Sequence, residues 1–149
     1  MRALLDTSFF VATESARPLG EIEGVTETEV SVVTLAELTI GVLAADDDHR
    51  SARVATLSAV ESTWDPLPID AEVAREFAQI VAALRASGRR VPILYALVAA
   101  TAIVEQIPVV TQDNDYGAIP GVEVIRVRWP PDGRSTSPPA SQHHHQQAC

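Results

Sequence analysis

The chain has 149 residues, 46% of them hydrophobic, and a formal net charge of −9, which fits one soluble globular domain plus a tail. All 11 basic residues are arginine, so chemistry that needs a lysine is excluded, including P-loop phosphate binding, Schiff bases and receiver-type phosphoaspartate sites. The acidic balance also argues against indiscriminate coating of nucleic acid, because a polyanion would be repelled overall.

Short apolar runs and helical spacing predict alternating strands and helices. In the first half we expect a strand at residues 3–5, a helix at 9–14, an acidic loop or frayed helix at 21–29, a strand at 30–33 and a helix from Thr34 to about Ala45. In the second half we expect a helix ending near Trp64, an edge strand at 66–69, an amphipathic helix from Asp70 to Gly88, a helix opened by Pro92, and strands at 109–111 and 122–127. This alternation favours an α/β fold with a mostly parallel sheet covered by helices.

Residues 129–149 differ in character from residues 1–128, which we expect to form the domain. The run PPDGRSTSPPASQHHHQQAC is rich in proline and serine without apolar periodicity, and it is expected to be disordered. Its histidines, His143, His144 and His145, resemble a truncated tag. No apolar stretch has the roughly 18 residues of a membrane span, and the start carries no secretory signal. With Cys149 as the single cysteine, no intramolecular disulfide forms, and we expect a cytoplasmic protein.

Three acidic residues stand just past apolar runs: Asp6 in LLDTS, Glu37 in VSVVTLAEL and Asp113 in PVVTQD. In an open α/β sheet, ligands bind outside the carboxyl ends of the strands, so we expect these acids to meet at one edge. A pocket with several carboxylates is costly unless something positive fills it, and a divalent cation is the usual filling. Asp115, two residues beyond Asp113, is a fourth candidate.

Each acid also has a local explanation. Thr34 and Glu37 fit a capping box, and Asp6 fits a turn with the two hydroxyl residues that follow it. Asp113 and Asp115 lie in TQDNDYG, where both residue types favour turns. Taken singly, these are the simpler interpretations. They do not explain why several acids follow apolar runs at the same edge, so the clustering indicates a metal site.

Four segments occur in order along the chain: MRALLDTSFFVA, SVVTLAELTIGV, RRVPILYALVAATA and VVTQDNDYGAI. They closely resemble the PIN-domain ribonucleases of the VapC type, the toxin halves of bacterial toxin–antitoxin pairs. The resemblance extends to about Val127 and implies a three-layer α/β/α sandwich around a mostly parallel sheet. It also implies hydrolysis of RNA phosphodiester bonds with Mg²⁺ or Mn²⁺. By position, it assigns catalytic and metal-binding roles to Asp6, Glu37, Asp113 and Asp115.

The resemblance implies supporting residues as well. Thr7, Ser8 and Thr111 would orient the carboxylates. Arg89 and Arg90 would contact the RNA backbone, although arginines near the end of a predicted helix equally complement its dipole.

The resemblance further implies protein partners. A VapB-like antitoxin would bind the early helices, so the apolar stripe of Val54, Leu57, Val60 and Trp64 is either core or interface. An antitoxin arginine would fit the acidic pocket. A homodimer is expected from the same resemblance.

One position departs from the family pattern. In RxPxxDxxIAATA an aspartate opens the helix, whereas here Tyr95 stands in its place, with Pro92 and the AATA ending holding the register. A neutral phenol is a poor Mg²⁺ ligand because its pKa lies near 10. Two hypotheses follow: a ribonuclease, weakened or still active, or a catalytically inactive homologue that binds antitoxin or RNA.

Overall fold

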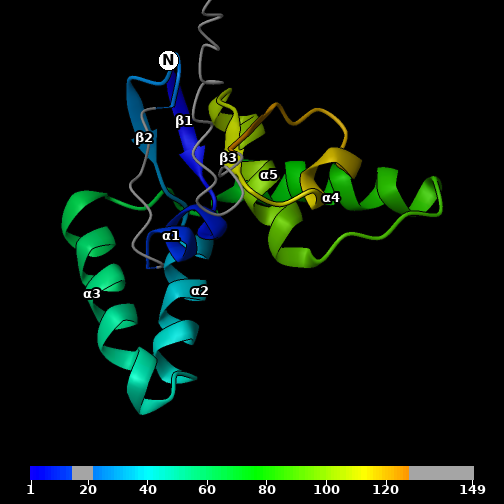
Figure 1. Ribbon diagram of the computed structural model, residues 1–149. Helices are drawn as coiled ribbons and strands as arrows, with labels where there is room; N and C mark the ends of the chain where they lie inside the picture. Colours follow the sequence, from blue (N-terminus) through cyan, green and yellow to red (C-terminus); the bar gives the residue numbers. More distant parts are fainter. Residues whose placement is uncertain (15–21, 128–149) are drawn as a thin grey trace, which may run out of the picture.

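The computed structural model describes residues 1–14 and 22–127 (Figure 1). The strands are β1 (Arg2–Leu5), β2 (Glu27–Glu29), β3 (Val109–Thr111) and β4 (Val124–Arg126). The helices are α1 (Thr7–Glu14), α2 (Val32–Leu43), α3 (Asp47–Thr63), α4 (Ala71–Ala86) and α5 (Ile93–Glu105), followed by a short 3-10 helix, η1 (Asp115–Ala118). The strands form one parallel sheet in the order β2-β1-β3-β4. An all-parallel sheet places the carboxyl ends of all its strands at one edge.

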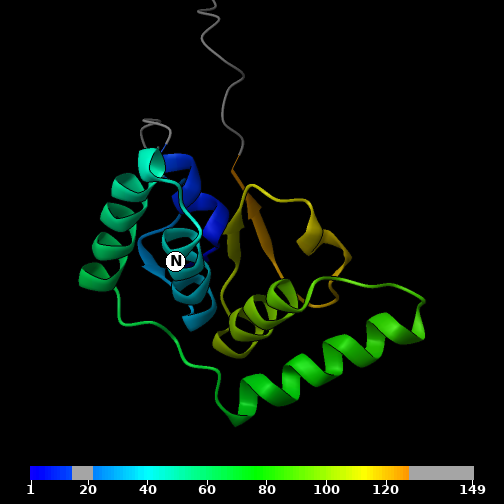
Figure 2. The ribbon, with the colours of Figure 1, turned by 90° about the horizontal axis from the view of Figure 1, so that it is seen from below.

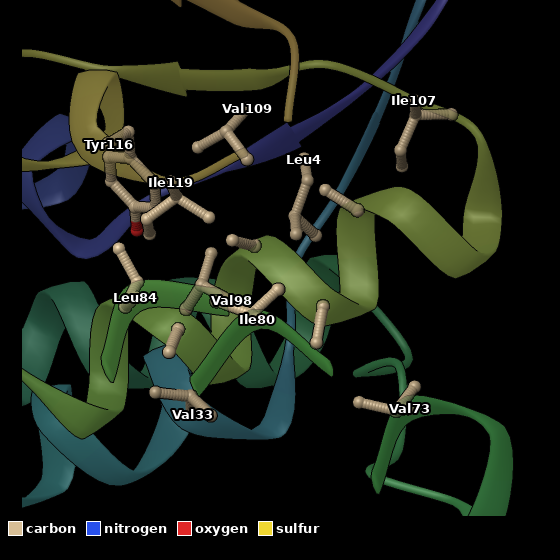
Figure 3. Close-up of a cluster of buried hydrophobic side chains, with 14 residues drawn as sticks. Leu4, Val33, Val73, Ile80, Leu84, Val98, Ile107, Val109, Tyr116 and Ile119 are labelled. Carbon is tan, nitrogen blue, oxygen red and sulfur yellow. The ribbon is translucent and has the colours of Figure 1, made fainter. Parts of the chain in front are cut away.

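Helices cover both faces of this sheet, which confirms the predicted three-layer α/β/α arrangement. Because successive strand residues point to opposite faces, Leu4 and Val109 pack into a core with α4 and α5, whereas Leu5 and Val110 pack into a second core with α1 and α3. Figure 2 shows these two helix pairs on opposite sides of the strands. Figure 3 shows Leu4 and Val109 above Val98 of α5.

The predicted strand at residues 30–33 is wrong. The sheet strand is β2, in a segment expected to be loop or frayed helix, and α2 already begins at Val32. The N-cap is Ser31, whose Oγ accepts from the backbone N–H groups of Val33 and Thr34 at 3.1 and 3.4 Å. A short, mostly apolar segment such as VSVV does not distinguish a buried strand from the start of a buried helix, and here the serine within it caps α2.

The remaining elements lie close to their predicted positions. The strand at 109–111 is confirmed, and the last strand is confirmed over Val124–Arg126. Asp70 caps α4 by accepting from the Val73 N–H at 3.0 Å. The expected edge strand at 66–69 is reduced to a single parallel bridge between Leu67 and Ser31.

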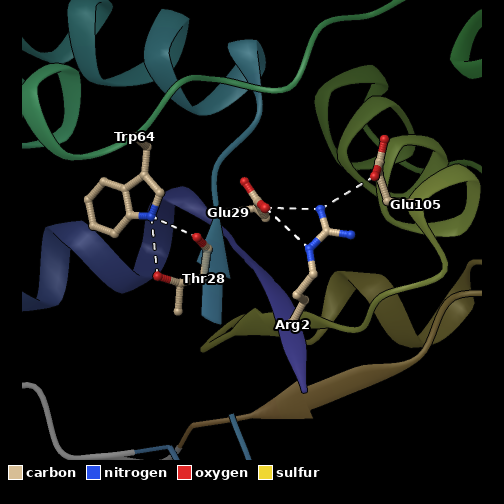
Figure 4. Close-up of polar contacts among 5 residues, drawn as sticks. All are labelled: Arg2, Thr28, Glu29, Trp64 and Glu105. Carbon is tan, nitrogen blue, oxygen red and sulfur yellow. Dashed lines mark hydrogen bonds and ion pairs between the residues drawn. The ribbon is translucent and has the colours of Figure 1, made fainter. Parts of the chain in front are cut away.

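Trp64, at the end of α3, ties that helix to the sheet. Its indole N–H donates to the carbonyl and the hydroxyl of Thr28 at 2.9 and 3.2 Å (Figure 4). In the predicted α3 stripe, Val60 is buried and Leu57 and Trp64 pack beside it, whereas Val54 is 42% exposed. The stripe is therefore core, except at Val54.

Arg2 of β1 links β2 to α5. Its guanidinium pairs with Glu29 of β2 at 2.9 Å and with Glu105 of α5 at 3.5 Å (Figure 4). Arg2 is the first residue of β1, so this ion-pair group lies at the end of that strand opposite to Asp6. Within the described residues, none of the helices combines the length and the apolar character that a membrane crossing requires. The predicted tail at 129–149, with its three histidines, lies outside the described residues.

Candidate active site

Asp6 follows β1 directly and is held by a set of hydroxyl groups. Its carboxylate accepts from the Tyr116 hydroxyl at 2.8 Å, from the Thr111 hydroxyl at 3.0 Å and from the Ser8 backbone N–H at 3.4 Å. The side chain is only 3% exposed. A buried carboxylate needs such donors in place of water, so its position and orientation are determined by the fold.

Asp113 follows β3, the strand beside β1. Its backbone N–H donates to the Thr111 hydroxyl at 3.0 Å, and the Gln112 N–H donates to the Ser8 hydroxyl at 3.0 Å. Ser8 and Thr111 are themselves hydrogen-bonded at 3.2 Å. The two strand ends are therefore joined through the hydroxyls of Ser8 and Thr111, both of which were predicted as orienting residues.

Glu37 comes from α2 and completes the set of carboxylates. Its Oε1 accepts from the Thr7 hydroxyl at 2.8 Å, the third predicted orienting contact. The capping-box alternative is wrong, because Ser31 caps α2 and the buried Thr34 hydroxyl has no partner among the described residues. Burial raises the pKa of Glu37, the Thr7 hydrogen bond lowers it, and the charges of Asp6 and Asp113 raise it further. The three carboxylates therefore sense one another electrostatically.

These carboxylates line one open cavity of about 480 Å³ at the carboxyl edge of the sheet. The predicted residues that line it are Asp6, Thr7, Ser8, Glu37 and Asp113. Thr111 lies behind Asp6 and is fully buried. Five further lining residues were not predicted from the sequence: Val11, Ala12, Leu94, Gln112 and Tyr116. The fourth predicted acid, Asp115, is exposed on η1 and does not line the cavity, although its charge acts on Tyr95.

Two tyrosines form one wall of the cavity. Tyr95 lies in the first turn of α5 and donates its hydroxyl to Asp113 Oδ2 at 2.7 Å, while Tyr116 donates to Asp6. Their rings meet edge to face with centroids 5.1 Å apart. Burial and the neighbouring carboxylates raise the pKa of both phenols, so both remain protonated donors. Tyr116 could have been found from the sequence as an aromatic residue in a polar turn, because a buried tyrosine hydroxyl usually has a hydrogen-bond partner.

The fit of a divalent cation can be judged from these contacts. Oxygen ligands suit Mg²⁺ and Mn²⁺, and the residues that would hold such an ion are Asp6, Glu37 and Asp113. In the described ranges, however, no three acidic, histidine or cysteine side chains converge as metal ligands. The Asp113 oxygen that accepts from Tyr95 is already engaged. The carboxylate oxygens are therefore suitable ligands for the ion, but the hydrogen bond from Tyr95 hinders Asp113 from binding it.

Arg89 and Arg90, predicted as RNA contacts, do not line the acidic cavity. They line a second hollow together with Arg85, between the end of α4 and the start of α5. The start of α5 contributes to both hollows, because Ile93 lines the second and the next residue, Leu94, lines the acidic cavity.

Comparison with known proteins identifies the family. Residues 3–122 match the PIN domain model. The chain is 47% identical over 128 residues to Ribonuclease VapC5 of Mycobacterium tuberculosis, covering 83% of this chain and 94% of that one. It is 44% identical over 126 residues to Ribonuclease VapC4 of the same organism, covering 85% and 97%.

Solved structures agree with these sequence matches. The crystal structure of VapBC-5, a member of the VapBC family of toxin–antitoxin systems from M. tuberculosis, superposes with a TM-score of 0.72 at 40% identity, covering 85% of this chain and 98% of that one. VapBC2 of Rickettsia felis, solved with a promoter DNA fragment, shares the fold with a TM-score of 0.73 at 19% identity, covering 86% and 100%. The chain therefore belongs to the PIN-domain family, among the ribonucleases named VapC.

Proposed function

We propose that the chain is the toxin of a type II toxin–antitoxin pair, an endoribonuclease that hydrolyses RNA phosphodiester bonds with Mg²⁺ or Mn²⁺. The observation that carries the proposal is the meeting of Asp6, Glu37 and Asp113 in one cavity at the carboxyl edge of the sheet. Its relatives at 47% and 44% identity are named ribonucleases, which supports the same reaction here.

Each acidic residue has a proposed role at the metal site. A bound cation would activate a water and neutralise charge that develops on the phosphate oxygens. Asp6 would be its most rigid ligand, because Tyr116 and Thr111 orient both of its oxygens. Glu37 of α2 and Asp113, which follows β3, would be the other two ligands of the ion. Asp115 lies outside the cavity, so its proposed contribution is to the local electrostatic field.

An antitoxin of the VapB type is the proposed regulator, and the structural neighbour VapBC-5 supports this. The acidic cavity suits an antitoxin guanidinium, which would pair with carboxylates that otherwise repel one another. The exposed apolar side chains of Ile40, Leu43 and Val54, on α2 and α3, suit the rest of such an interface. A homodimer and a cytoplasmic location are part of the same proposal.

One observation favours a second candidate, a catalytically inactive homologue that binds antitoxin or RNA. The Tyr95 hydroxyl engages Asp113 Oδ2 at 2.7 Å, at the position where the family pattern has an aspartate. A ligand that must first lose a charge-assisted hydrogen bond binds the ion more weakly, by about tenfold for each 1.4 kcal/mol.

RNA cleavage by the natural chain and by Tyr95→Asp separates the two candidates. The ribonuclease proposal expects metal-dependent cleavage by the natural chain, faster cleavage by Tyr95→Asp and none by Asp6→Asn. If only Tyr95→Asp cleaves, the natural chain is the inactive homologue. Calorimetric titration with Mn²⁺ provides the control: equal affinity of the natural chain and Tyr95→Asp would show that Tyr95 does not limit the metal site.

A further inference from the structure

A second hollow, of about 380 Å³, opens between the end of α4 and the start of α5. We call it the arginine pocket. Its lining residues are Val81, Leu84, Arg85, Arg89, Arg90, Val91 and Ile93. It combines three guanidinium groups at its rim with four aliphatic side chains, a composition unlike that of the acidic cavity beside it.

In residues 1–14 and 22–127, the three arginines have no carboxylate partner. Among the described residues, no ion pair or side-chain hydrogen bond involves Arg85, Arg89 or Arg90, and all three are exposed. On a chain of net charge −9, the pocket thus gathers three cations that no ion pair of the described part neutralises. The turn at Gly88, where φ is +70°, brings Arg89 and Arg90 back beside Arg85.

The helix dipole does not account for all three cations. A cation complements the partial negative charge of a helix only within its last turn. Arg85 meets that condition in α4, but Arg89 and Arg90 follow the helix end at Ala86. Their charges therefore remain available for an external anion, and a planar guanidinium suits the oxygens of a phosphate.

The aliphatic floor of the arginine pocket indicates more than an anion. Ile93 is 64% exposed at the start of α5, and Val91 is partly buried beside it. A free phosphate gains nothing from such a surface, whereas a nucleobase has an apolar face that packs on it. Because Ile93 is followed directly by Leu94 of the acidic cavity, one strand could occupy both hollows.

We propose that the arginine pocket is a nucleotide subsite, which holds one unpaired nucleotide of the RNA next to the phosphate in the acidic cavity. The arginines contact its phosphate, and the base packs on Val91 and Ile93. The base must be unstacked to enter, so the substrate class is single-stranded RNA or a loop. This inference rests on the proposed function for the identity of the polymer, but it concerns binding and not cleavage.

Binding is measured by fluorescence anisotropy with a labelled single-stranded RNA of about ten nucleotides, in EDTA so that no cleavage occurs. We expect Arg89→Ala/Arg90→Ala to weaken binding about tenfold or more and to reduce the slope of log affinity against log salt by about one, because both arginines contact the same phosphate. Arg75→Ala is the control for charge: it removes one positive charge, half of what the double variant removes, from an exposed site on α4 outside the pocket. It should change the affinity less than twofold once corrected for net charge.

The aliphatic floor is tested with Ile93→Ser and with RNA that carries abasic sites. We expect this substitution to weaken ordinary RNA about threefold and to leave abasic RNA unaffected, because no base remains to lose its contact. Duplex RNA should bind more weakly than single strands. Since Ile93 is exposed, the melting temperature should not change appreciably, which keeps the test free of misfolding.

Two results would overturn the subsite. One is equal binding by Arg89→Ala/Arg90→Ala and Arg75→Ala. The other is a change of oligomeric state in the double variant, seen by size-exclusion chromatography, which would make the pocket an interface between copies. If the natural chain cleaves RNA while the double variant binds and cleaves normally, only the subsite fails. If binding behaves as expected without any cleavage, only the proposed ribonuclease activity fails.

Discussion

Asp6 and Asp113 stand at the ends of neighbouring strands, and each accepts a hydrogen bond from a tyrosine hydroxyl, yet the protein holds them differently. Asp6 is 3% exposed and accepts from Tyr116, Thr111 and the backbone of Ser8. Asp113 is partly buried, and in the described chain its carboxylate has one hydrogen-bond partner, Tyr95 of α5. The Asp6 carboxylate is thus part of the core, whereas among the described residues the Asp113 carboxylate depends on a single hydrogen bond, which a substitution at Tyr95 removes.

The largest expected effect is on stability, and it should differ between Asp6 and Asp113. Asp6→Ala leaves the buried Tyr116 hydroxyl without its acceptor and leaves the Thr111 hydroxyl only Ser8 to donate to, so the free energy of unfolding should fall by about 2–4 kcal/mol. Asp113→Ala leaves one partly buried hydroxyl that water can reach, and it should change stability by less than about 1 kcal/mol. Urea unfolding in EDTA measures both, with unchanged m-values as the check that the unfolding reaction is the same. Equal losses would mean that the hydroxyl network around Asp6 does not anchor it.

The next largest effect is on metal affinity, and it should have opposite signs for substitutions of Tyr95 and Tyr116. Tyr95→Phe frees an oxygen of Asp113, so Mn²⁺ should bind about threefold to tenfold more tightly. Tyr116→Phe removes a donor that orients Asp6, so Mn²⁺ should bind about tenfold more weakly. Calorimetric titration of the two variants beside the natural chain gives the comparison. If both substitutions shift the affinity in the same direction, the two tyrosines act alike and the difference drawn between them is wrong.

Strands β1 and β3 could be predicted from the sequence, whereas strand β2 could not. Strands β1 and β3 are short apolar runs flanked by turn residues, and the acids after them could be placed because all parallel strands end at one edge. Strand β2, with the sequence ETE, carries no apolar signal at all. In the sheet, Thr28 pairs with Ala3 and Glu29 pairs with Leu4. Nothing in the sequence of β2 indicates this pairing.

The contacts of the site were harder to predict than its members. Glu37 was found as a site residue, but a capping role competed with it until Ser31 appeared as the cap of α2. Tyr95 was identified as a departure from the family pattern, whereas its bond to Asp113 depends on the packing of α5 against η1. Tyr116 was missed because a turn position suggests local chemistry, and its partner lies 110 residues away in sequence. Long-range pairs of this kind leave no periodic pattern in a single sequence.

The smallest expected effect concerns Glu37, whose ionisation opposes folding in the absence of a cation. Burial and the charges of Asp6 and Asp113 raise its pKa in the folded protein above the ordinary 4.5. An acid with a raised folded pKa binds protons more readily in the native state, so its unfavourable contribution is absent below the unfolded pKa and grows as pH rises through the folded pKa. At neutral pH, Glu37→Gln should therefore stabilise the protein, while the Thr7 hydroxyl can still donate to the amide oxygen.

Because Glu37 is partly exposed, solvent screening keeps this gain within about 1 kcal/mol. Thermal unfolding in EDTA at pH 7 should show the variant melting higher than the natural chain, and the difference should vanish below about pH 4.5. Glu61→Gln, at an exposed position on α3, is the matched control and should show no such pH-dependent difference. With Mn²⁺ added, the order should reverse, because the natural chain gains the binding free energy of the ion and the variant lacks a ligand. A variant that melts lower than the natural chain in EDTA would mean that the Thr7–Glu37 hydrogen bond outweighs burial and repulsion.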